Sequence, residues 1–111
     1  MKIKAGIIGA AGYTGGELIR LLLNHPKAEI CFAHSNSNGE KPISNIHKDL
    51  VGDTDLLFSK DFHQNIDVLF LCVGHGEART FLNEYVINDN IKIIDLSQDF
   101  RLKANSQFGN K

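Results

Sequence analysis

The sequence predicts an α/β domain built on a doubly wound parallel sheet. Segments with strand character alternate with segments of helical periodicity along the chain, and this order builds a parallel sheet with helices on both faces. The glycines concentrate between residues 9 and 16, directly after the first strand-like segment. Residues 68–73 are continuously apolar, as expected for a strand that is covered on both faces.

The first strand is predicted at residues 2–8, and the first helix at residues 14–24. Thr14 and Glu17 have the spacing of a capping box, which satisfies backbone N–H groups at a helix start. Pro26 cannot continue a helix and disfavours helical geometry in the residue before it. The apolar side chains between these limits repeat at helical spacing and would form one buried face: Leu18, Ile19, Leu22 and Leu23.

The rest of the chain continues the alternation. Further strands are predicted at residues 29–33, 66–73 and 92–96, with a second helix at residues 77–86. Residues 40–65 carry weak signals, and we expect loop there with one helical turn and strand character at residues 56–58. Because no covering helix follows the last predicted strand, we expect the domain to be incomplete.

The composition is that of an ordinary globular domain. Hydrophobic residues make up 42% and charged residues 23% of the 111 residues, and the net charge is -1. This balance offers no basic surface, so we expect no nucleic-acid partner. No apolar run reaches the roughly 18 residues of a membrane span, and the N-terminus lacks a signal peptide, so we expect no membrane partner. Cys31 and Cys72 lie inside apolar runs, which fits a reducing cytoplasm.

The glycine turn carries the main functional signal. Its spacing, Gly9-x-x-Gly12-x-x-Gly15, is a variant of the Gly-x-Gly-x-x-Gly fingerprint of Rossmann-type dinucleotide-binding domains. Missing Cβ atoms let the backbone approach a pyrophosphate, and a helix N-terminus offers unpaired N–H groups and a positive dipole end. We therefore expect phosphate binding here, with a purely structural turn as the alternative. The expected contacts come from Gly9, Ala11, Gly12, Tyr13, Thr14 and Gly15.

The loop after the second strand bears on the choice of cofactor. NAD-specific domains place an acidic residue about 20 residues past the glycines, where it accepts from the ribose 2′-hydroxyl. Residues 34–38 contain no carboxylate, so a 2′-phosphate would meet no repulsion there. This favours NADP over NAD, with Ser35 and Ser37 at the adenosine end of the cofactor. A polar loop that contacts nothing is the other interpretation.

The remaining candidates lie at the ends of the later strands. Gly74 and His75 follow the strand at residues 66–73, where open α/β sheets bind ligands, and we expect cofactor contact there; an ordinary loop histidine is the alternative. Ser97 ends the last strand and could line the same cleft. Cys72 has no basic neighbour in sequence to lower its pKa, so core packing is favoured over a nucleophilic role. The histidines lack metal-ligand spacing, so no metal site is expected.

Four segments carry a resemblance to a known family. Residues 6–18 contain a Gly-Tyr-Thr-Gly turn, residues 35–38 read Ser-Asn-Ser-Asn, residues 70–76 end in Gly-His-Gly, and residues 94–102 contain Asp-Leu-Ser-Gln-Asp-Phe-Arg-Leu. In order and spacing they resemble the motifs of N-acetyl-γ-glutamyl-phosphate reductases, which belong to the semialdehyde dehydrogenase superfamily. The likeness covers essentially the whole chain.

The resemblance implies that the full enzyme reduces N-acetyl-γ-glutamyl phosphate to N-acetylglutamate semialdehyde with NADPH, in arginine biosynthesis. In the family a cysteine thiolate attacks the acyl phosphate, phosphate leaves, hydride reduces the thioester, and a histidine serves as acid and base. That cysteine stands in a Pro-Gly-Cys-Tyr motif, which these 111 residues lack.

The missing motif bears on where the chemistry takes place. We expect no catalytic residue in this chain, because the cysteine and the histidine that the family uses would lie beyond Lys111. Residues 1–111 are accordingly expected to be an incomplete N-terminal NAD(P)-binding domain that is inactive alone. The resemblance implies a homo-oligomeric enzyme whose catalytic and dimerisation domain lies outside this chain.

Two positions depart from the family pattern. Asn36 stands where the family has an arginine beside the adenosine phosphate, and asparagine cannot form a charged fork to phosphate. Gly74 replaces the proline before His75, which loosens that turn. Two other functions stay open. One is an aspartate-semialdehyde dehydrogenase-like enzyme, which normally lacks the block at residues 94–102, and the other is a nucleotide-binding module without catalysis.

Overall fold

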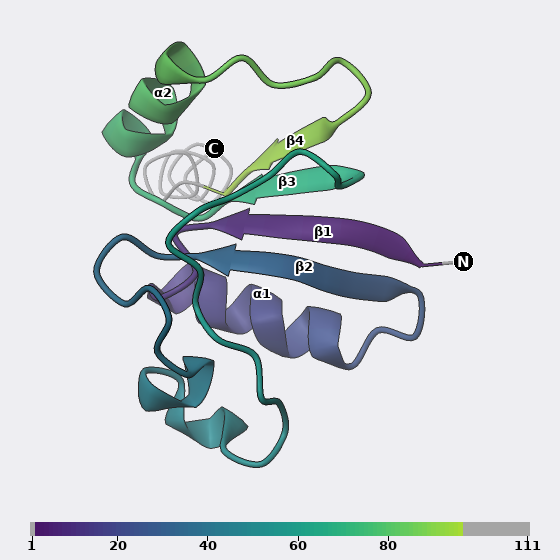
Figure 1. Cartoon of the computed structure of the whole chain (residues 1–111), viewed down its shortest axis with the longest axis vertical. Helices are drawn as coiled ribbons and strands as arrows, with labels where there is room; N and C mark the ends of the chain where they lie inside the picture. Colours follow the sequence, from purple (N-terminus) through teal and green to yellow (C-terminus); the bar gives the residue numbers. More distant parts are fainter. Residues whose placement is uncertain (1, 97–111) are drawn as a thin grey trace, which may run out of the picture.

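The computed structural model of the chain describes residues 2–96, apart from the side chain of His75. Within this range one parallel sheet has the strand order β2-β1-β3-β4 (Figure 1). The strands are β1 (Ile3–Ile8), β2 (Ala28–His34), β3 (Val68–Leu71) and β4 (Lys92–Asp95). The helices are α1 (Tyr13–Leu23) and α2 (His75–Glu84), with 3₁₀ turns η1 (Ile43–Asn45) and η2 (Lys48–Leu50) between β2 and β3. The predicted α/β class with a parallel sheet is confirmed.

Each face of the sheet carries its own helix and its own core. Consecutive residues of a strand point to opposite faces, so Ile7 and Ile8 of β1 enter different buried clusters. Ile7 belongs to a cluster with Ile19 of α1, whereas Ile8 belongs to a cluster with Leu69 of β3 and Ala78 of α2. The two helices accordingly lie on opposite sides of the sheet (Figure 1). This is the doubly wound arrangement that the alternation predicts.

The connection between β2 and β3 contributes to the core on the α1 side. Ile43 of η1 and Phe58 are buried in the same cluster as the apolar face of α1. The strand expected at residues 56–58 does not form, since Leu57 makes only an isolated antiparallel bridge with Pro42. Proline has no N–H to extend such a ladder. Two 3₁₀ turns stand where one helical turn is expected.

Both helices begin earlier than predicted, because a glycine with extended backbone precedes each one. Gly12 (φ -77°, ψ 176°) is the N-cap of α1, and no side chain caps that end. Thr14 is therefore the second helical residue, and the predicted capping box of Thr14 with Glu17 is wrong. Gly74 (φ -66°, ψ 163°) is the N-cap of α2, so His75 is already helical. No helix within residues 2–96 has the length and apolarity needed to cross a bilayer.

The central strand β3 is shorter than the apolar run at residues 66–73 that predicts it, although backbone pairing with β1 continues past both of its ends. The N–H of Asp67 donates to the carbonyl of Lys4 at 2.8 Å, and the N–H of Cys72 donates to the carbonyl of Ile8 at 2.8 Å. Strand limits commonly differ by a residue or two for this reason. The pairing holds the end of β3 directly beside the start of the glycine turn.

An ion pair joins η2 to α1. The guanidinium of Arg20 donates from Nε and Nη2 to both carboxylate oxygens of Asp49, with 2.7 Å between Nη2 and Oδ1. This hydrogen-bonded pairing lowers the pKa of Asp49 from 3.8 to about 2. Because both groups are solvent-exposed, water screens the interaction and its contribution to stability is small.

We expect the Asp49→Asn variant to melt a few degrees or less below the unaltered protein at neutral pH. The pKa of Asp49 is depressed in the folded state, so the stabilisation is complete above about pH 4 and is lost as the pH falls through about 2. Melting curves at pH 7 and pH 2 measure this. Asp53→Asn on the same loop is the matched control, and a melting difference for Asp49→Asn that persists at pH 2 would contradict the assignment.

Candidate functional site

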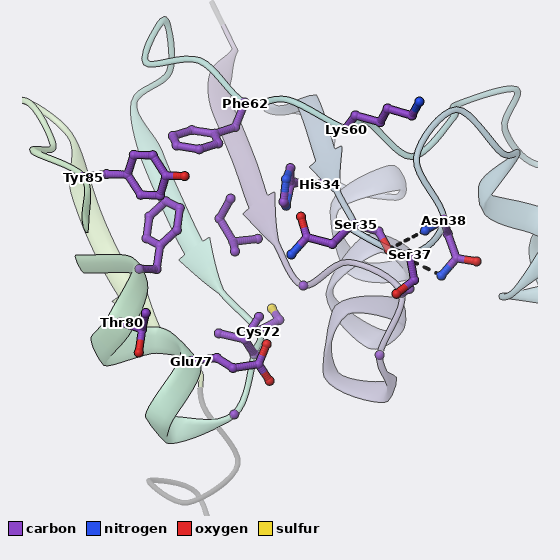
Figure 2. A pocket seen from close by; sticks show the side chains of 18 of the residues that line it. His34, Ser35, Ser37, Asn38, Lys60, Phe62, Cys72, Glu77, Thr80 and Tyr85 are labelled. Atoms are coloured by element: carbon purple, nitrogen blue, oxygen red, sulfur yellow. Dashed lines mark hydrogen bonds between the residues drawn. The ribbon is translucent and has the colours of Figure 1, made fainter. Parts of the chain in front are cut away.

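A cleft of about 1230 Å³ lies at the carboxyl ends of β1, β2 and β3. It is lined by the turn after β1, the loop after β2, residues 60–62, the end of β3 and one side of α2. Figure 2 shows side chains from these segments around a common space. Ligands of open parallel sheets bind at this edge, at the point where the chain places its next strands on opposite sides of the first. Here β2 lies on one side of β1 and β3 on the other. The cleft is therefore the candidate functional site.

Two glycines of the turn are required by the fold itself. Gly9 has a φ of +81°, and a Cβ added there would lie 2.5 Å from Cγ1 of Val73 and 2.9 Å from the carbonyl carbon of Cys72. A Cβ on Gly15 would lie 2.7 Å from the carbonyl oxygens of both Gly9 and Ala10. These positions serve the tight turn and the close packing of α1 against the strand ends.

The fold does not require a glycine at position 12. A Cβ added to Gly12 would have the carbonyl oxygen of Gly9 as its nearest neighbour, at 3.8 Å, and its backbone angles suit any residue. Gly12 is exposed and lines the cleft. The missing side chain leaves room over the first N–H groups of α1, which have no intrahelical acceptor. The dipole of the helix favours negative charge at this point, so the space suits an anion.

Ser35 shapes the loop after β2. Its side chain is buried, and its hydroxyl oxygen accepts hydrogen bonds from the backbone N–H of Asn38 at 3.2 Å and from the Asn38 side-chain amide at 3.4 Å. Figure 2 shows these bonds closing the loop on itself. Asn36 and Ser37 are exposed on the same loop and line the cleft. Ser35 thus fixes the conformation of the loop in which Asn36 and Ser37 line the cleft.

A second segment, residues 59–62, runs beside this loop, and the sequence does not predict that it belongs to the site. The N–H of Ser59 donates to the carbonyl of Ala33 at 2.8 Å, and the N–H of Ser35 donates to the carbonyl of Ser59 at 3.0 Å. This pairing carries Lys60 and Phe62 into the lining of the cleft. No local sequence pattern marks them, because they reach the site through contacts between residues far apart in the chain.

Aromatic rings form one wall of the cleft. The ring of Phe62 lies 5.1 Å from that of Phe81 and 5.0 Å from that of Tyr85, measured between centroids. The imidazole of His34, at the end of β2, meets Phe62 edge-on at 5.9 Å. Phe62 is half-buried and Tyr85 is exposed, and both line the cleft. Such a wall offers a flat heterocycle a surface for stacking.

A buried histidine that does not line the cleft supports the glycine turn. Nε2 of His47 lies 2.8 Å from the carbonyl oxygen of Ala10, and a Cβ on Gly16 would lie 2.6 Å from the His47 ring. The ring also meets Phe58 edge-on at 6.1 Å. His47 therefore links the turn to the β2–β3 connection. Its contact with Gly16 explains that glycine by packing alone.

The structure favours packing over reactivity for both cysteines. Cys72 lines the cleft, yet burial raises the pKa of its thiol to about 12, with Asp95 contributing in the same direction. Burial also raises the pKa of Cys31. A thiol with a raised pKa carries little of the nucleophilic thiolate at neutral pH. Among residues 2–96, no three His, Cys, Asp or Glu side chains are grouped so as to hold a metal ion.

The residues predicted to bind the cofactor divide into three groups. Those that line the cleft are Gly9, Ala11, Gly12, Ser35, Ser37 and Gly74. Tyr13, Thr14 and Gly15 form the first turn of α1 beside it without lining it. His75 opens α2 with its backbone, and Ser97 lies outside the described residues.

The catalytic residues are expected beyond Lys111, which is outside the described residues 2–96. That the family's cysteine and histidine lie beyond Lys111 therefore stays a prediction. What the structure adds is that neither Cys31 nor Cys72 has the lowered pKa that a nucleophilic cysteine needs.

We expect Cys72 to react with iodoacetamide at pH 8 at least about tenfold more slowly in the folded protein than in urea, because its raised pKa suppresses the thiolate. Mass spectrometry of timed samples gives the rate at each cysteine. The Cys31→Ser variant isolates the Cys72 signal and serves as the control. Equal rates in the folded and unfolded protein would contradict a raised pKa.

Comparison with known proteins identifies close relatives over almost the whole chain. A sequence profile described as semialdehyde dehydrogenase, NAD binding domain, matches residues 4–110. The N-acetyl-gamma-glutamyl-phosphate reductase of Christiangramia forsetii is 52% identical over 103 residues, which is 93% of this chain and 32% of that protein. The protein of the same name from Flavobacterium johnsoniae is 48% identical over 109 residues, which is 98% of this chain and 34% of that protein. The chain thus spans about a third of the length of these curated relatives.

A solved structure shares the fold. The aspartate semialdehyde dehydrogenase with NADP from Candida albicans superposes with a TM-score of 0.67 at 18% identity, covering 91% of this chain and 31% of that one. The parallel sheet, the cleft at its carboxyl edge and the glycine turn agree with the profile that matches residues 4–110. The chain therefore belongs to the semialdehyde dehydrogenase NAD-binding domain family.

Proposed function

We propose that this chain is the NADPH-binding domain of an enzyme that reduces N-acetyl-γ-glutamyl phosphate to N-acetylglutamate semialdehyde, in arginine biosynthesis. The observation that carries the cofactor assignment is the open space at Gly12, over an uncapped helix N-terminus inside the cleft. Packing explains Gly9 and Gly15 but leaves Gly12 unexplained, whereas a bound pyrophosphate explains it. The reductase assignment is supported by the names of relatives that are about half identical to this chain.

The cleft fits the parts of the cofactor in order. The pyrophosphate would lie against the turn after β1 and the first turn of α1, whose proposed contacts are Gly9, Ala11, Gly12, Tyr13, Thr14 and Gly15. The adenine would stack on the aromatic wall at Phe62, with the adenosine ribose near Ser35 and Ser37. The nicotinamide would extend toward Gly74, His75 and Ser97. When bound, NADPH supplies the hydride, and this chain binds and orients it.

The thiol chemistry of the reaction needs residues beyond these. A thiolate that attacks an acyl phosphate has to be activated by a lowered pKa, whereas burial raises the pKa of both Cys31 and Cys72. We propose that the nucleophile and the acid–base histidine belong to a catalytic and dimerisation domain, beyond Lys111, of a longer, homo-oligomeric cytoplasmic enzyme. The chain's share of the relatives' length, about a third, supports this division.

An enzyme acting on aspartyl phosphate is the second candidate, favoured by the fold it shares with the aspartate semialdehyde dehydrogenase of Candida albicans. The chain is only 18% identical to that enzyme but 52% identical to an N-acetyl-gamma-glutamyl-phosphate reductase, which favours the first candidate. The two candidates differ in substrate and share the cofactor. A nucleotide-binding module without catalysis is the third.

We expect the gene for the whole protein to restore growth of an arginine auxotroph that lacks the reductase, and not of an auxotroph for lysine and threonine. The purified enzyme should oxidise N-acetylglutamate semialdehyde with NADP⁺ only when inorganic phosphate is present, as measured by the absorbance of NADPH. The 111-residue chain alone should give no turnover. Growth of the second auxotroph would select the aspartyl enzyme, and growth of neither would favour the module.

We expect Gly12→Ala to weaken NADPH binding at least about tenfold while leaving the melting temperature within a degree or two, because the added Cβ meets only the ligand. Gly15→Ala is the contrasting variant, since its Cβ collides with two carbonyl oxygens and should destabilise the fold by about 1–3 kcal/mol. Calorimetric titration and thermal melts measure the two effects. Unchanged NADPH affinity in Gly12→Ala would sink the pyrophosphate assignment.

A further inference from the structure

We propose that Lys60 binds the 2′-phosphate of NADP(H) and thereby sets the preference for NADPH over NADH. The proposal rests on the proposed cofactor function and adds a residue that determines specificity. A 2′-phosphate carries a charge of about -1.5 to -2 near neutral pH, and its strong partners in proteins are cations. The loop at residues 34–39 offers hydroxyls and amides but no lysine or arginine. The positive charge therefore has to come from another segment.

Lys60 is the one lysine or arginine among the described residues that line the cleft. Backbone pairing places it there, since the neighbouring Ser59 exchanges hydrogen bonds with Ala33 and Ser35 on either side of the end of β2. The pairing is part of the main chain, so the position of Lys60 does not depend on its own side-chain contacts. Figure 2 shows Lys60 at the rim of the cleft, with its ammonium end pointing away from Ser37.

The stem of Lys60 lies on this loop. A Cβ added at Gly39 would collide with Cγ of Lys60, so the absence of a side chain at position 39 lets the methylene groups of Lys60 lie against the loop backbone. Long cationic side chains commonly pack their stems in this way while the charged head stays in water. The contact holds the methylene stem of Lys60 against the loop at Gly39, and the ammonium group lies near the carboxylate of Glu40.

A carboxylate already occupies the neighbourhood of the ammonium. Oε2 of Glu40 lies 3.7 Å from Nζ of Lys60, and both side chains are mostly exposed, at 74% and 64%. Such a pair is weak and exchanges readily. Glu40 has a φ of +71°, a backbone conformation that residues other than glycine rarely adopt, and its N–H donates to the carbonyl of Phe58 at 2.6 Å. On this proposal a 2′-phosphate would replace the carboxylate of Glu40 beside Lys60.

The other polar groups of the loop would supply neutral hydrogen bonds to the phosphate. The hydroxyl oxygen of Ser35 is engaged by Asn38, so Ser37 is the serine whose exposed hydroxyl can approach a phosphate. Asn36 is exposed beside it and carries no charge. Recognition by this loop therefore combines neutral donors at residues 36–37 with one cation from residue 60.

The test is a set of binding titrations with NADPH, NADH, adenosine 2′,5′-bisphosphate and AMP. For Lys60→Gln we expect about a tenfold loss of affinity for NADPH and for the bisphosphate, with the affinities for NADH and AMP unchanged within about twofold. Lys60→Arg should retain most of the preference. Lys41→Gln is the matched control, because Lys41 is an exposed lysine close in space to the same loop that does not line the cleft. Glu40→Gln should strengthen NADPH binding a few-fold by removing the competing carboxylate.

The outcomes separate this proposal from the cofactor function on which it rests. If Lys60→Gln keeps the unaltered ratio of NADPH to NADH affinity, the role of Lys60 is overturned and cofactor binding stands. An equal loss for NADPH and NADH overturns it too, because that result marks a general structural effect. A protein that binds neither dinucleotide before any substitution overturns the cofactor function itself, and Lys60 with it.

Discussion

The site depends on one steric constraint, the close passage of the glycine turn across the end of β3. Gly9 adopts a positive φ within reach of Val73 and the carbonyl of Cys72, so a side chain has no room there. The chain can therefore reverse into α1 directly above the sheet edge. A second close approach, of Gly15 to the carbonyls of Gly9 and Ala10, sets the helix against the turn. Together these contacts aim the N-terminus of α1 into the cleft, where its dipole is available to an anion.

The long connection between β2 and β3 contacts both the glycine turn and α1 and helps to hold them in place. His47 reaches the carbonyl of Ala10 and packs on Gly16, so it contacts the turn and the first part of α1 together. Two residues later, Asp49 pairs with Arg20 on the same helix. Phe58 closes the core beneath them. A segment with weak secondary-structure signals is thus the part of the chain that holds the binding turn in position.

The fold could be predicted from the sequence because its signals are local. Apolar runs and helical periodicity mark the strands and helices within a few residues of their observed limits, and the glycine spacing places the turn. The capping-box pattern at Thr14 misplaces the start of α1, because Gly12, with extended backbone and no capping side chain, occupies the N-cap position. The segment containing Lys60 and Phe62 could not be predicted, since backbone pairing between Ser59 and the end of β2 brings it to the cleft. Long-range pairing of this kind leaves no periodic trace in a single sequence.

The pairing of Ser59 with the end of β2 has a consequence for how coenzyme preference would evolve. The loop at residues 34–38 and the lysine at position 60 belong to different stretches of the gene and meet only in the folded chain. A single codon change at position 60 would remove this positive charge from the lining of the cleft while leaving the glycine turn and the loop unchanged. On the proposed role of Lys60, two relatives with identical loops would differ in coenzyme preference if they differ at position 60. The residue that follows the His34–Ser59 bridge would on this proposal determine coenzyme choice together with the loop.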